Sequence, residues 1–344
     1  MAWYSWAMSD ARVRPVAVVG AGSWGTGLAW LLGRKGLTTR LWCRRAELAE
    51  AIGREHFNPS YLPEAELPDT VSATADLAAA VADTEAVLLT VPSVGLRRVA
   101  EQMAAHLPAG TPVISAVKGL DHQTGERMTT VLHGIFGDRN PVAALSGPNL
   151  AHEIAAGQPA GAVIAHGDPA VRQPLQHLLS SPTFRVYTNP DVAGVELCGA
   201  LKNPLAIAAG VSDGLGYGDN TKAALMTRGM HEITRLGVAL GADRRTFAGL
   251  CGFGDLLATC HSPHSRNRTL GERLGRGERL DAIVSASSEV AEGVPTTRTA
   301  TRLAHGFGVE MPILFELHAV LFEGKPPADA VRTLLARVTV EEFS

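Results

Sequence analysis

The stretch that decides the fold is P-V-A-V-V-G-A-G-S-W-G-T-G, from Pro15 to Gly27. A short run of β-branched apolar residues stands directly before Gly20, Gly22 and Gly25, which have the G-x-G-x-x-G spacing of a strand, a tight turn and a helix. In such a unit Gly20 permits the turn, Gly22 lets the backbone approach a pyrophosphate, and Gly25 lets the helix close on its strand. The helix N-terminus then faces the phosphates.

The surroundings of these glycines decide the interpretation, because the chain has 36 glycines and the spacing also arises by chance. The apolar run Leu28 to Leu32 continues the stretch as a helix, and Thr39 to Cys43 follows as a second strand. A strand, a glycine turn, a helix and a second strand at this distance predict a dinucleotide-binding unit.

The second strand is followed by two arginines, Arg44 and Arg45, about where an NAD-selective site usually has an acidic residue for the ribose 2′-hydroxyl. Two guanidinium groups can pair with a 2′-phosphate, which a carboxylate would repel. We therefore expect NADP(H) to be accepted, with NAD(H) not rejected. The alternative is a solvated basic loop.

The composition is that of a globular chain of 344 residues, with 46% hydrophobic and 19% charged residues and a net charge of -3. Dispersed basic residues argue against nucleic acid as a partner. The sequence predicts no signal peptide and no membrane-spanning helix, so a cytoplasmic location is expected. Residues 1–14 mix aromatic and polar residues without a period and predict a loose tail.

Cysteine spacing gives no C-x-x-C pair and predicts reduced thiols at Cys43, Cys198, Cys251 and Cys260. One segment holds Cys251, Cys260, His261 and His264, which are all candidate zinc ligands. Their spacing matches no common zinc site, so we predict no metal.

Two kinds of pattern divide the chain. Strand-length apolar segments bounded by turn residues recur at 86–91, 112–117, 142–146, 160–165 and 184–187. Beyond about residue 190 the apolar residues take helical spacing, at 221–240, 290–305 and 311–322, and a glycine-rich loop is expected at 211–220. The fold class is therefore α/β: a doubly wound Rossmann domain over residues 15–190, followed by an all-α domain over residues 191–344.

Four further segments carry a family resemblance: K-G-L at Lys118, S-G-P-N-L-A-H-E at 146–153, L-C-G-A-L-K-N-P-L-A-I-A-A-G at 197–210, and S-R-N-R at 265–268, preceded by G-F-G-D ending at Asp255. With the glycine turn, and in this order, they make the chain resemble the soluble bacterial NAD(P)-dependent glycerol-3-phosphate dehydrogenases. The resemblance implies reversible reduction of dihydroxyacetone phosphate to sn-glycerol 3-phosphate for glycerophospholipid synthesis, and a homodimer.

The catalytic candidates also follow from chemistry, because a ketone-reducing site needs a proton donor and a polar surround for the developing alkoxide. Lys202 stands among apolar residues, where desolvation would lower its pKa. Lys118 follows the strand 112–117, at the sheet edge where open α/β folds bind ligands. Each could instead be a solvated lysine. The resemblance adds Asp255, which could otherwise cap a helix.

For the substrate, Ser265, Arg266 and Asn267 offer a hydroxyl, a guanidinium and an amide near an expected helix start at 269–274. We interpret them as a phosphate clamp, with an ordinary polar helix entry as the alternative. The resemblance adds Gly147 and Asn149, in the turn after the strand 142–146, together with Lys118, Lys202 and Asp255.

For the cofactor, the resemblance implies contacts in addition to the glycines and the arginine pair: Ser23, Trp24, Lys118, Ala151, Arg266, Val290 and Glu292. Two departures from the family stand out. Asn149 and Leu150 replace the usual Ser or Thr followed by Phe, and Pro204 replaces a β-branched residue. Pro204 would either kink a helix near Ala200 or stand near a helix start.

Two other functions compete with this interpretation. A related two-domain dehydrogenase for a hydroxy acid or sugar acid would also use an arginine for its substrate carboxylate. A nucleotide-sensing protein without chemistry is disfavoured, because Lys118, Lys202 and Asp255 are all present.

Overall fold

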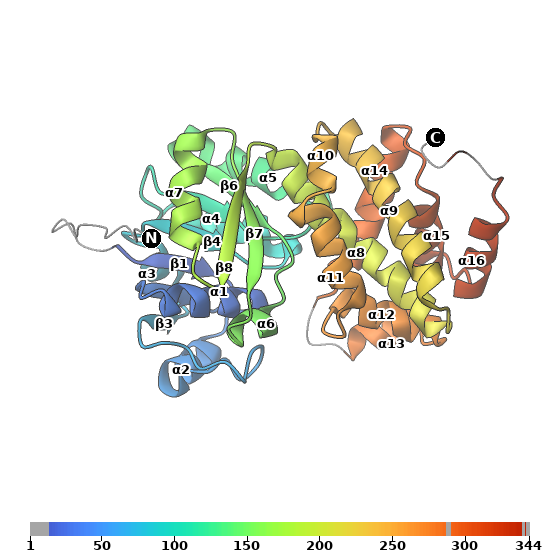
Figure 1. The fold of residues 1–344 in the computed structure, drawn as a ribbon. Coiled ribbons are helices and arrows are strands. Elements are labelled where there is room, and N and C mark those ends of the chain that lie inside the picture. Colours follow the sequence, from blue (N-terminus) through green and yellow to red (C-terminus); the bar gives the residue numbers. More distant parts are fainter. Residues whose placement is uncertain (1–13, 287–289, 339–340, 342–344) are drawn as a thin grey trace.

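One eight-stranded sheet forms the N-terminal part of the computed structural model, which describes residues 14–286, 290–338 and 341 (Figure 1). The strand order is β3-β2-β1-β4-β5-β6-β7-β8, and every neighbouring pair is parallel except β6 with β7. The strands are β1 (Val16–Val19), β2 (Thr39–Trp42), β3 (Val71–Thr74), β4 (Ala86–Leu89), β5 (Val113–Ser115), β6 (Val142–Ser146), β7 (Ala160–Ala165) and β8 (Phe184–Asn189).

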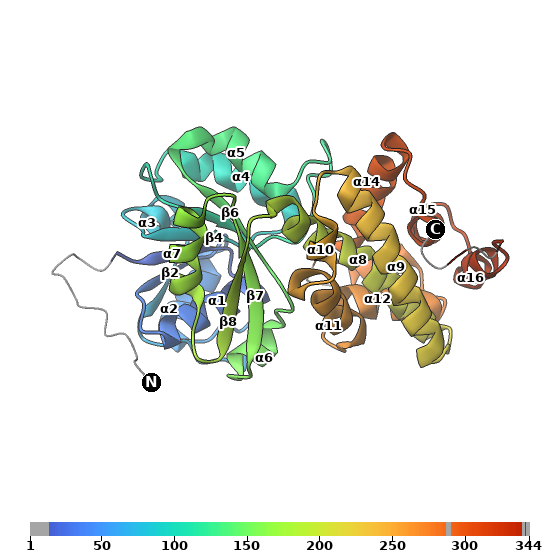
Figure 2. The same cartoon turned by 45° about the horizontal axis from the view of Figure 1, so that its top comes forward.

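Helices cover both faces of this sheet, as the doubly wound prediction requires (Figures 1 and 2). They are α1 (Ser23–Arg34), α2 (Ala46–Glu55), α3 (Leu77–Val81), α4 (Ser93–Ala104), α5 (Met128–Phe136), α6 (Ala151–Ala155) and α7 (Pro169–Leu179), with a 3-10 turn η1 at Gly137–Arg139. The fold class expected from the sequence is confirmed.

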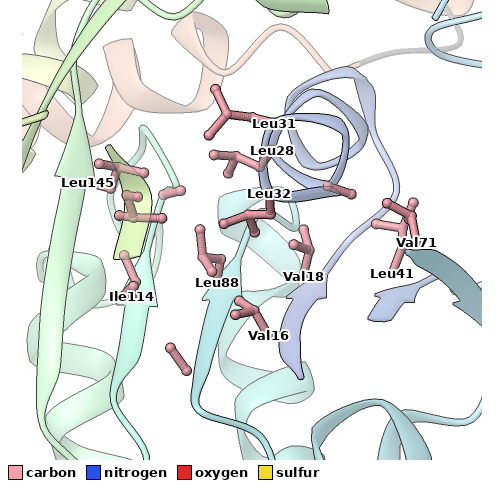
Figure 3. Packing of buried hydrophobic residues seen from close by; sticks show 14 of the residues in the cluster. Val16, Val18, Leu28, Leu31, Leu32, Leu41, Val71, Leu88, Ile114 and Leu145 are labelled. Atoms are coloured by element: carbon pink, nitrogen blue, oxygen red, sulfur yellow. The ribbon is translucent and has the colours of Figure 1, made fainter. Parts of the chain in front are cut away.

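Because helices pack on both faces of the sheet, its central strands β1 and β4 are apolar along their whole length. Val16 and Val18 of β1 point into one core with α1, whereas Ala17 and Val19 point into a second core with α4 and α5. Figure 3 shows the first core, where Leu28 and Leu32 of α1 pack over the sheet. A strand that is buried on both faces needs a continuous apolar run rather than an alternating one.

The C-terminal part consists of helices in the described residues, in agreement with the all-α expectation (Figure 2). They are α8 (Val192–Gly214), α9 (Asp219–Ala239), α10 (Arg244–Phe247), the π-helical turn η2 (Leu250–Gly254), α11 (Asp255–His261), α12 (Arg266–Gly275), α13 (Leu280–Ser285), α14 (Gly293–Gly306), α15 (Pro312–Phe322) and α16 (Pro327–Leu335). The expected boundary at residue 190 falls between β8 and α8.

Helix α8 is the centre of this part and crosses α12 with the two backbones in direct contact. A Cβ on Gly210 of α8 would lie 2.0 Å from the Arg268 carbonyl oxygen, and a Cβ on Gly271 of α12 would lie 2.0 Å from the Ile207 carbonyl oxygen. Only glycine allows this approach. The crossing fixes the start of α12, and with it residues 265–267, relative to α8.

Several expectations need correction. The 23-residue helix α8 is long and apolar enough to span a membrane, with a mean hydropathy of 1.2, contrary to the expectation of no such run. However, 83% of that window is buried in the fold, as in the core helix of a globular protein. The glycine-rich loop is shorter than 211–220, because α8 ends at Gly214 and α9 begins at Asp219. Pro204 lies inside α8, not near its start.

Strand β3 is not predicted by the sequence pattern, because V-S-A-T is short and only its first residue, Val71, is fully buried. The tail expected at residues 1–14 lies outside the described residues except for Arg14.

Candidate active site

The glycine turn has the geometry that its spacing predicts. Gly20 adopts φ +122°, and a Cβ on Gly25 would lie 1.8 Å from the Gly20 carbonyl oxygen. A Cβ on Gly22 would meet no atom within 4 Å, and no side chain caps the N-terminus of α1. The turn therefore leaves open space in front of a helix N-terminus that no side chain caps, which is the arrangement that binds a pyrophosphate.

Residues beside the turn complete this cradle. The indole Nε1 of Trp24 is buried and has no hydrogen-bond partner, so a donor is available there. Asn58 donates to the Ala21 carbonyl oxygen at 2.9 Å and to Thr26 Oγ1 at 2.7 Å, which holds the turn in place. Asn58 was not identified from the sequence, because it lies in an irregular connection 37 residues from Ala21.

Both arginines after β2 are exposed. Arg45 donates to Ser60 Oγ at 3.3 Å, and its guanidinium lies over the Tyr61 ring, 6.0 Å from the centroid. The connection after α2 thus adds a hydroxyl and an aromatic ring to this side of the turn. Neither Ser60 nor Tyr61 carries a motif that would have identified it.

All three predicted catalytic residues meet at one point. Lys118 Nζ donates to Asp255 Oδ2 at 2.8 Å and to the Gly147 carbonyl oxygen at 2.6 Å. Lys202 Nζ is paired with the other carboxylate oxygen, Oδ1, and donates to Thr259 Oγ1 at 2.6 Å. Asp255 is only 1% exposed. One buried carboxylate therefore holds two ammonium groups side by side.

Thr259 was not identified from the sequence, although a signal existed. Thr259 follows Asp255 by four residues on α11, so both side chains lie on the same helix face. Its hydroxyl donates to the Asp255 carbonyl oxygen at 2.6 Å, which leaves its lone pairs for Lys202.

The electrostatics of the cluster favour a lysine that exchanges its proton near neutrality. Burial lowers the pKa of Lys202 to about 7; the Asp255 charge opposes the shift and the Lys118 charge adds to it. The second ammonium group prevents Asp255 from fully compensating the desolvation of Lys202.

The two lysines come from different parts of the fold, and close backbone contacts bring them together. Lys118 follows β5, and a Cβ on Gly199 of α8 would lie 3.5 Å from its Cγ and 2.6 Å from Ser146 Oγ. Asn203, next to Lys202, donates to the Lys118 carbonyl oxygen at 3.0 Å. The start of α8 therefore lies directly against the carboxyl ends of β5 and β6.

The three predicted clamp residues lie at the start of α12 but differ in accessibility. Ser265 is buried, and its hydroxyl caps the helix by accepting from Arg268 N at 3.3 Å. Asn267 is also buried; it donates to Asn203 Oδ1 at 3.0 Å and accepts from Gly293 N at 2.9 Å. Arg266 is exposed and donates to the Val290 carbonyl oxygen at 3.3 Å. The helix starts at Arg266, three residues earlier than expected.

The turn after β6 lies next to Lys118. Gly147 adopts φ +142°, and a Cβ there would lie 2.9 Å from Gly161 O. Asn149 donates to that same carbonyl oxygen at 3.1 Å, while its own Oδ1 is buried without a partner. Ala151 begins α6 and is packed against α1, with its Cβ 3.4 Å from the position of a Cβ on Gly27.

The segment before α14 reaches the sheet edge. Glu292 accepts from Ser93 N at 2.9 Å and from Ser93 Oγ at 2.6 Å, where α4 begins after β4. Glu292 is therefore bonded to the start of α4. Val290 is 41% exposed beside Arg266.

The candidate zinc ligands do not converge. Among the described residues no group of three or more His, Cys, Asp or Glu could hold a metal ion. Cys251 and Cys260 are buried free thiols, and His261 contacts the Leu257 carbonyl oxygen at 3.0 Å.

Comparison with known proteins gives a consistent assignment. Residues 15–172 match the family model of the NAD-dependent glycerol-3-phosphate dehydrogenase N-terminus, and residues 191–332 match that of the C-terminus. The chain is 50% identical over 327 residues to glycerol-3-phosphate dehydrogenase (NAD(P)+) of Moorella thermoacetica, covering 95% of this chain and 97% of that one.

A solved structure supports the same assignment. Glycerol-3-phosphate dehydrogenase from Coxiella burnetii superposes with a TM-score of 0.91 at 39% identity, covering 94% of this chain and 99% of that one. A ketopantoate reductase from Ralstonia eutropha has a TM-score of 0.59 at 19% identity over 92% and 99% of the two chains, so it shares the fold alone. The chain belongs to the NAD-dependent glycerol-3-phosphate dehydrogenase family.

Proposed function

We propose that this chain is an NAD(P)-dependent oxidoreductase that reversibly reduces dihydroxyacetone phosphate to sn-glycerol 3-phosphate, for glycerophospholipid synthesis. The observation that carries the proposal is the buried Lys118–Asp255–Lys202 cluster at the carboxyl ends of β5 and β6. Family membership supplies the substrate class, and the cluster supplies the chemistry that such a substrate needs.

The cofactor site is assigned to the glycine turn. Open space at Gly22, the uncapped N-terminus of α1 and the unpartnered Trp24 Nε1 fit a dinucleotide. We assign Gly20, Gly22, Ser23, Trp24 and Gly25 to the pyrophosphate. When bound, the nicotinamide supplies the hydride. The remaining cofactor contacts in this proposal come from Arg44, Arg45, Lys118, Ala151, Arg266, Val290 and Glu292.

Lys202 is the proposed proton donor in reduction and acceptor in oxidation. Reduction of a carbonyl carbon leaves negative charge on oxygen, and an ammonium within hydrogen-bond reach stabilises this charge and delivers the proton. With a pKa of about 7, Lys202 can both lose and regain a proton near neutral pH. Lys118 adds a second positive charge for the same oxygen. Asp255 orients both lysines through its two carboxylate oxygens.

Arg266, Ser265 and Asn267 are the proposed phosphate-binding residues, together with Gly147 and Asn149 beside the carbonyl end. The side chains of Ser265 and Asn267 are buried and bonded to other protein groups, whereas the Arg266 guanidinium is exposed and donates to the Val290 carbonyl oxygen. Because Arg266 is the only one of the three with a positive charge, we assign its guanidinium the main contact with the phosphate, and assign the other two the task of shaping the turn around it.

A direct assay tests this function. Purified protein is mixed with NADPH, and the absorbance of the reduced cofactor is followed after addition of dihydroxyacetone phosphate, unphosphorylated dihydroxyacetone or a 2-keto acid. We expect consumption with the phosphorylated ketone only. Consumption with the keto acid instead would favour a hydroxy-acid dehydrogenase. Binding of NADPH with no consumption of any substrate would favour a nucleotide sensor.

We also propose that the protein works as a cytoplasmic homodimer. Four buried free thiols, at Cys43, Cys198, Cys251 and Cys260, suit a reducing compartment. Light scattering coupled to size-exclusion chromatography tests the dimer: a mass of one 36.2 kDa chain would contradict it.

A further inference from the structure

Two histidines connect the sheet domain to the turn that precedes the proposed clamp. The His264 imidazole stacks on that of His152, with ring centroids 5.2 Å apart and planes inclined by 29°. His152 is the second residue of α6, and His264 lies in the connection from α11 to α12, directly before Ser265. Figures 1 and 2 show α6 on the side of the sheet domain that faces α11 and α12.

The sheet-domain half of this contact has partners within its own domain. His152 Nδ1 is paired with the Glu64 carboxylate, which comes from the connection after α2. Beside this pair, Leu62 and Ala65 of the connection pack on Ala151 of α6 in a small buried cluster. The apolar packing of Ala151 and the hydrogen bond to Glu64 therefore place His152 on the sheet domain.

The helical-domain half of this contact, His264, directly precedes the proposed clamp residues in the chain. His264 N donates to Ser262 Oγ at 3.1 Å, and Ser265 N donates to the Ser262 carbonyl oxygen at 3.2 Å. Ser265 in turn caps α12, whose first residue is Arg266. Because these bonds tie successive residues of one turn, a displacement of His264 would displace Ser265 and Arg266 with it.

We propose that the His152–His264 stack is a positioning contact that holds the Ser265–Arg266 turn against the sheet domain, so that Arg266 meets the substrate phosphate. This inference rests on the function proposed above and deepens it. Neither histidine is a catalytic residue. Their effect on the reaction is exerted through Arg266.

A carboxylate completes this contact. The titratable groups in contact at this point are His152 of α6, His264 of the 262–265 turn and Glu64 of the connection after α2. Burial favours a raised pKa for Glu64, but the hydrogen bond from His152 and the charges of His152 and His264 lower it. The Glu64 carboxylate therefore ties the stack to the connection after α2.

Steady-state kinetics of the holoenzyme test the positioning role. His264→Ala and His152→Ala should each raise the KM for dihydroxyacetone phosphate by about 2- to 10-fold, the range expected when one aromatic pair is removed. The kcat should change less than the KM. The double variant should be no worse than either single variant, because both remove the same contact. His264→Phe should restore the KM, since it keeps a ring for stacking.

His305→Ala is the matched control. His305 also stacks on an aromatic ring, that of Phe315, at 4.6 Å and 9°, but within the helical domain. The His305→Ala variant should leave the KM for dihydroxyacetone phosphate unchanged.

The outcomes separate the two proposals. Equal KM values for His264→Ala, His305→Ala and wild type would overturn the positioning role while leaving the enzyme function intact. Additive effects in the double variant would also overturn it. Absence of wild-type turnover with dihydroxyacetone phosphate would instead contradict the proposed function.

Discussion

At the scale of single residues, the protonation of Lys202 should control the pH dependence of the reaction. Its pKa of about 7 means that the ammonium form, which reduction needs, is depleted as the pH rises above 7. The neutral form, which oxidation needs, increases over the same range. We expect kcat for reduction to fall above pH 7 and kcat for oxidation to rise. Profiles that run in parallel in both directions would contradict this role.

Replacing that side chain tests the same assignment without changing pH. Lys202→Met keeps the length and apolar body of the side chain but has no proton to give, so we expect kcat to fall by about 10² to 10⁴. Affinity for NADPH should stay within a few-fold by fluorescence titration. Lys325→Met, which breaks the 2.5 Å ion pair with Glu316 elsewhere in the helical domain, serves as the control. Near wild-type turnover in Lys202→Met would direct attention to Lys118.

The arginine pair after β2 should set the cofactor preference. Replacing Arg44 and Arg45 together with Ala should weaken NADPH binding by about 1.5 to 3 kcal/mol for each charge-assisted hydrogen bond to the 2′-phosphate that the substitution removes. NADH binding should change little, because it has no 2′-phosphate. Calorimetric titration of both cofactors measures the difference. Equal weakening for the two cofactors would exclude a role in phosphate recognition.

At the scale of elements, the crossing of α8 and α12 has no room for a larger side chain at its glycines. Gly271→Ala places a Cβ 2.0 Å from the Ile207 carbonyl oxygen, so the helices must separate. We expect the free energy of unfolding to fall by about 1–3 kcal/mol, as for overpacked cores. The separation should also raise the KM for dihydroxyacetone phosphate, because residues 265–267 lie at the start of α12.

Urea denaturation measures the free energy of unfolding of Gly271→Ala, and steady-state kinetics measures its KM for dihydroxyacetone phosphate. Gly53→Ala in α2 is the control, because a Cβ there meets no atom within 4 Å. It should be neutral or stabilise the fold by up to about 1 kcal/mol. If Gly271→Ala behaved like Gly53→Ala, the helix contact would not be the constraint that the backbone distances indicate.

At the scale of the whole molecule, a buried ion pair joins α8 to the sheet domain. Glu196 of α8 accepts from Arg127 Nη1 and from Thr129 N, both at 2.8 Å, at the start of α5. Burial raises the pKa of Glu196 against these opposing contacts. Arg127→Met should therefore destabilise the fold, because the carboxylate is left in the interior with fewer donors.

We expect Arg127→Met to lower the free energy of unfolding by up to about 3 kcal/mol near neutral pH. The loss is limited because Glu196 can take up a proton instead of staying charged. The cost should shrink as the pH falls, since protonation removes the unpaired charge. Chemical denaturation at several pH values measures it. Arg54→Met is the control: its ion pair with Glu55 is exposed and should contribute almost nothing. A cost that is equal for the two variants would show that Glu196 is not held by Arg127.

The sequence by itself determined the sheet domain, the change to helices near residue 190 and which side chains are candidates for the reaction. These follow from local rules: glycine spacing around Gly20 and Gly25 is imposed by one turn, and apolar runs report burial of their own strands. Strand β3 could not be predicted in this way, because V-S-A-T is too short and too little buried to show a pattern.

Only the tertiary structure decided which side chains share a site. Lys118 and Asp255 are 137 residues apart, and Lys202 and Asp255 are 53 apart, so no local period could pair them with one carboxylate. The value of about 7 for the Lys202 pKa, whose lowering alone was expected from the sequence, comes from packing between distant elements, as do the buried position of Asn267 and the His152–His264 stack. A sequence pattern records contacts along one element, whereas desolvation and ion pairing depend on what other elements place around a side chain.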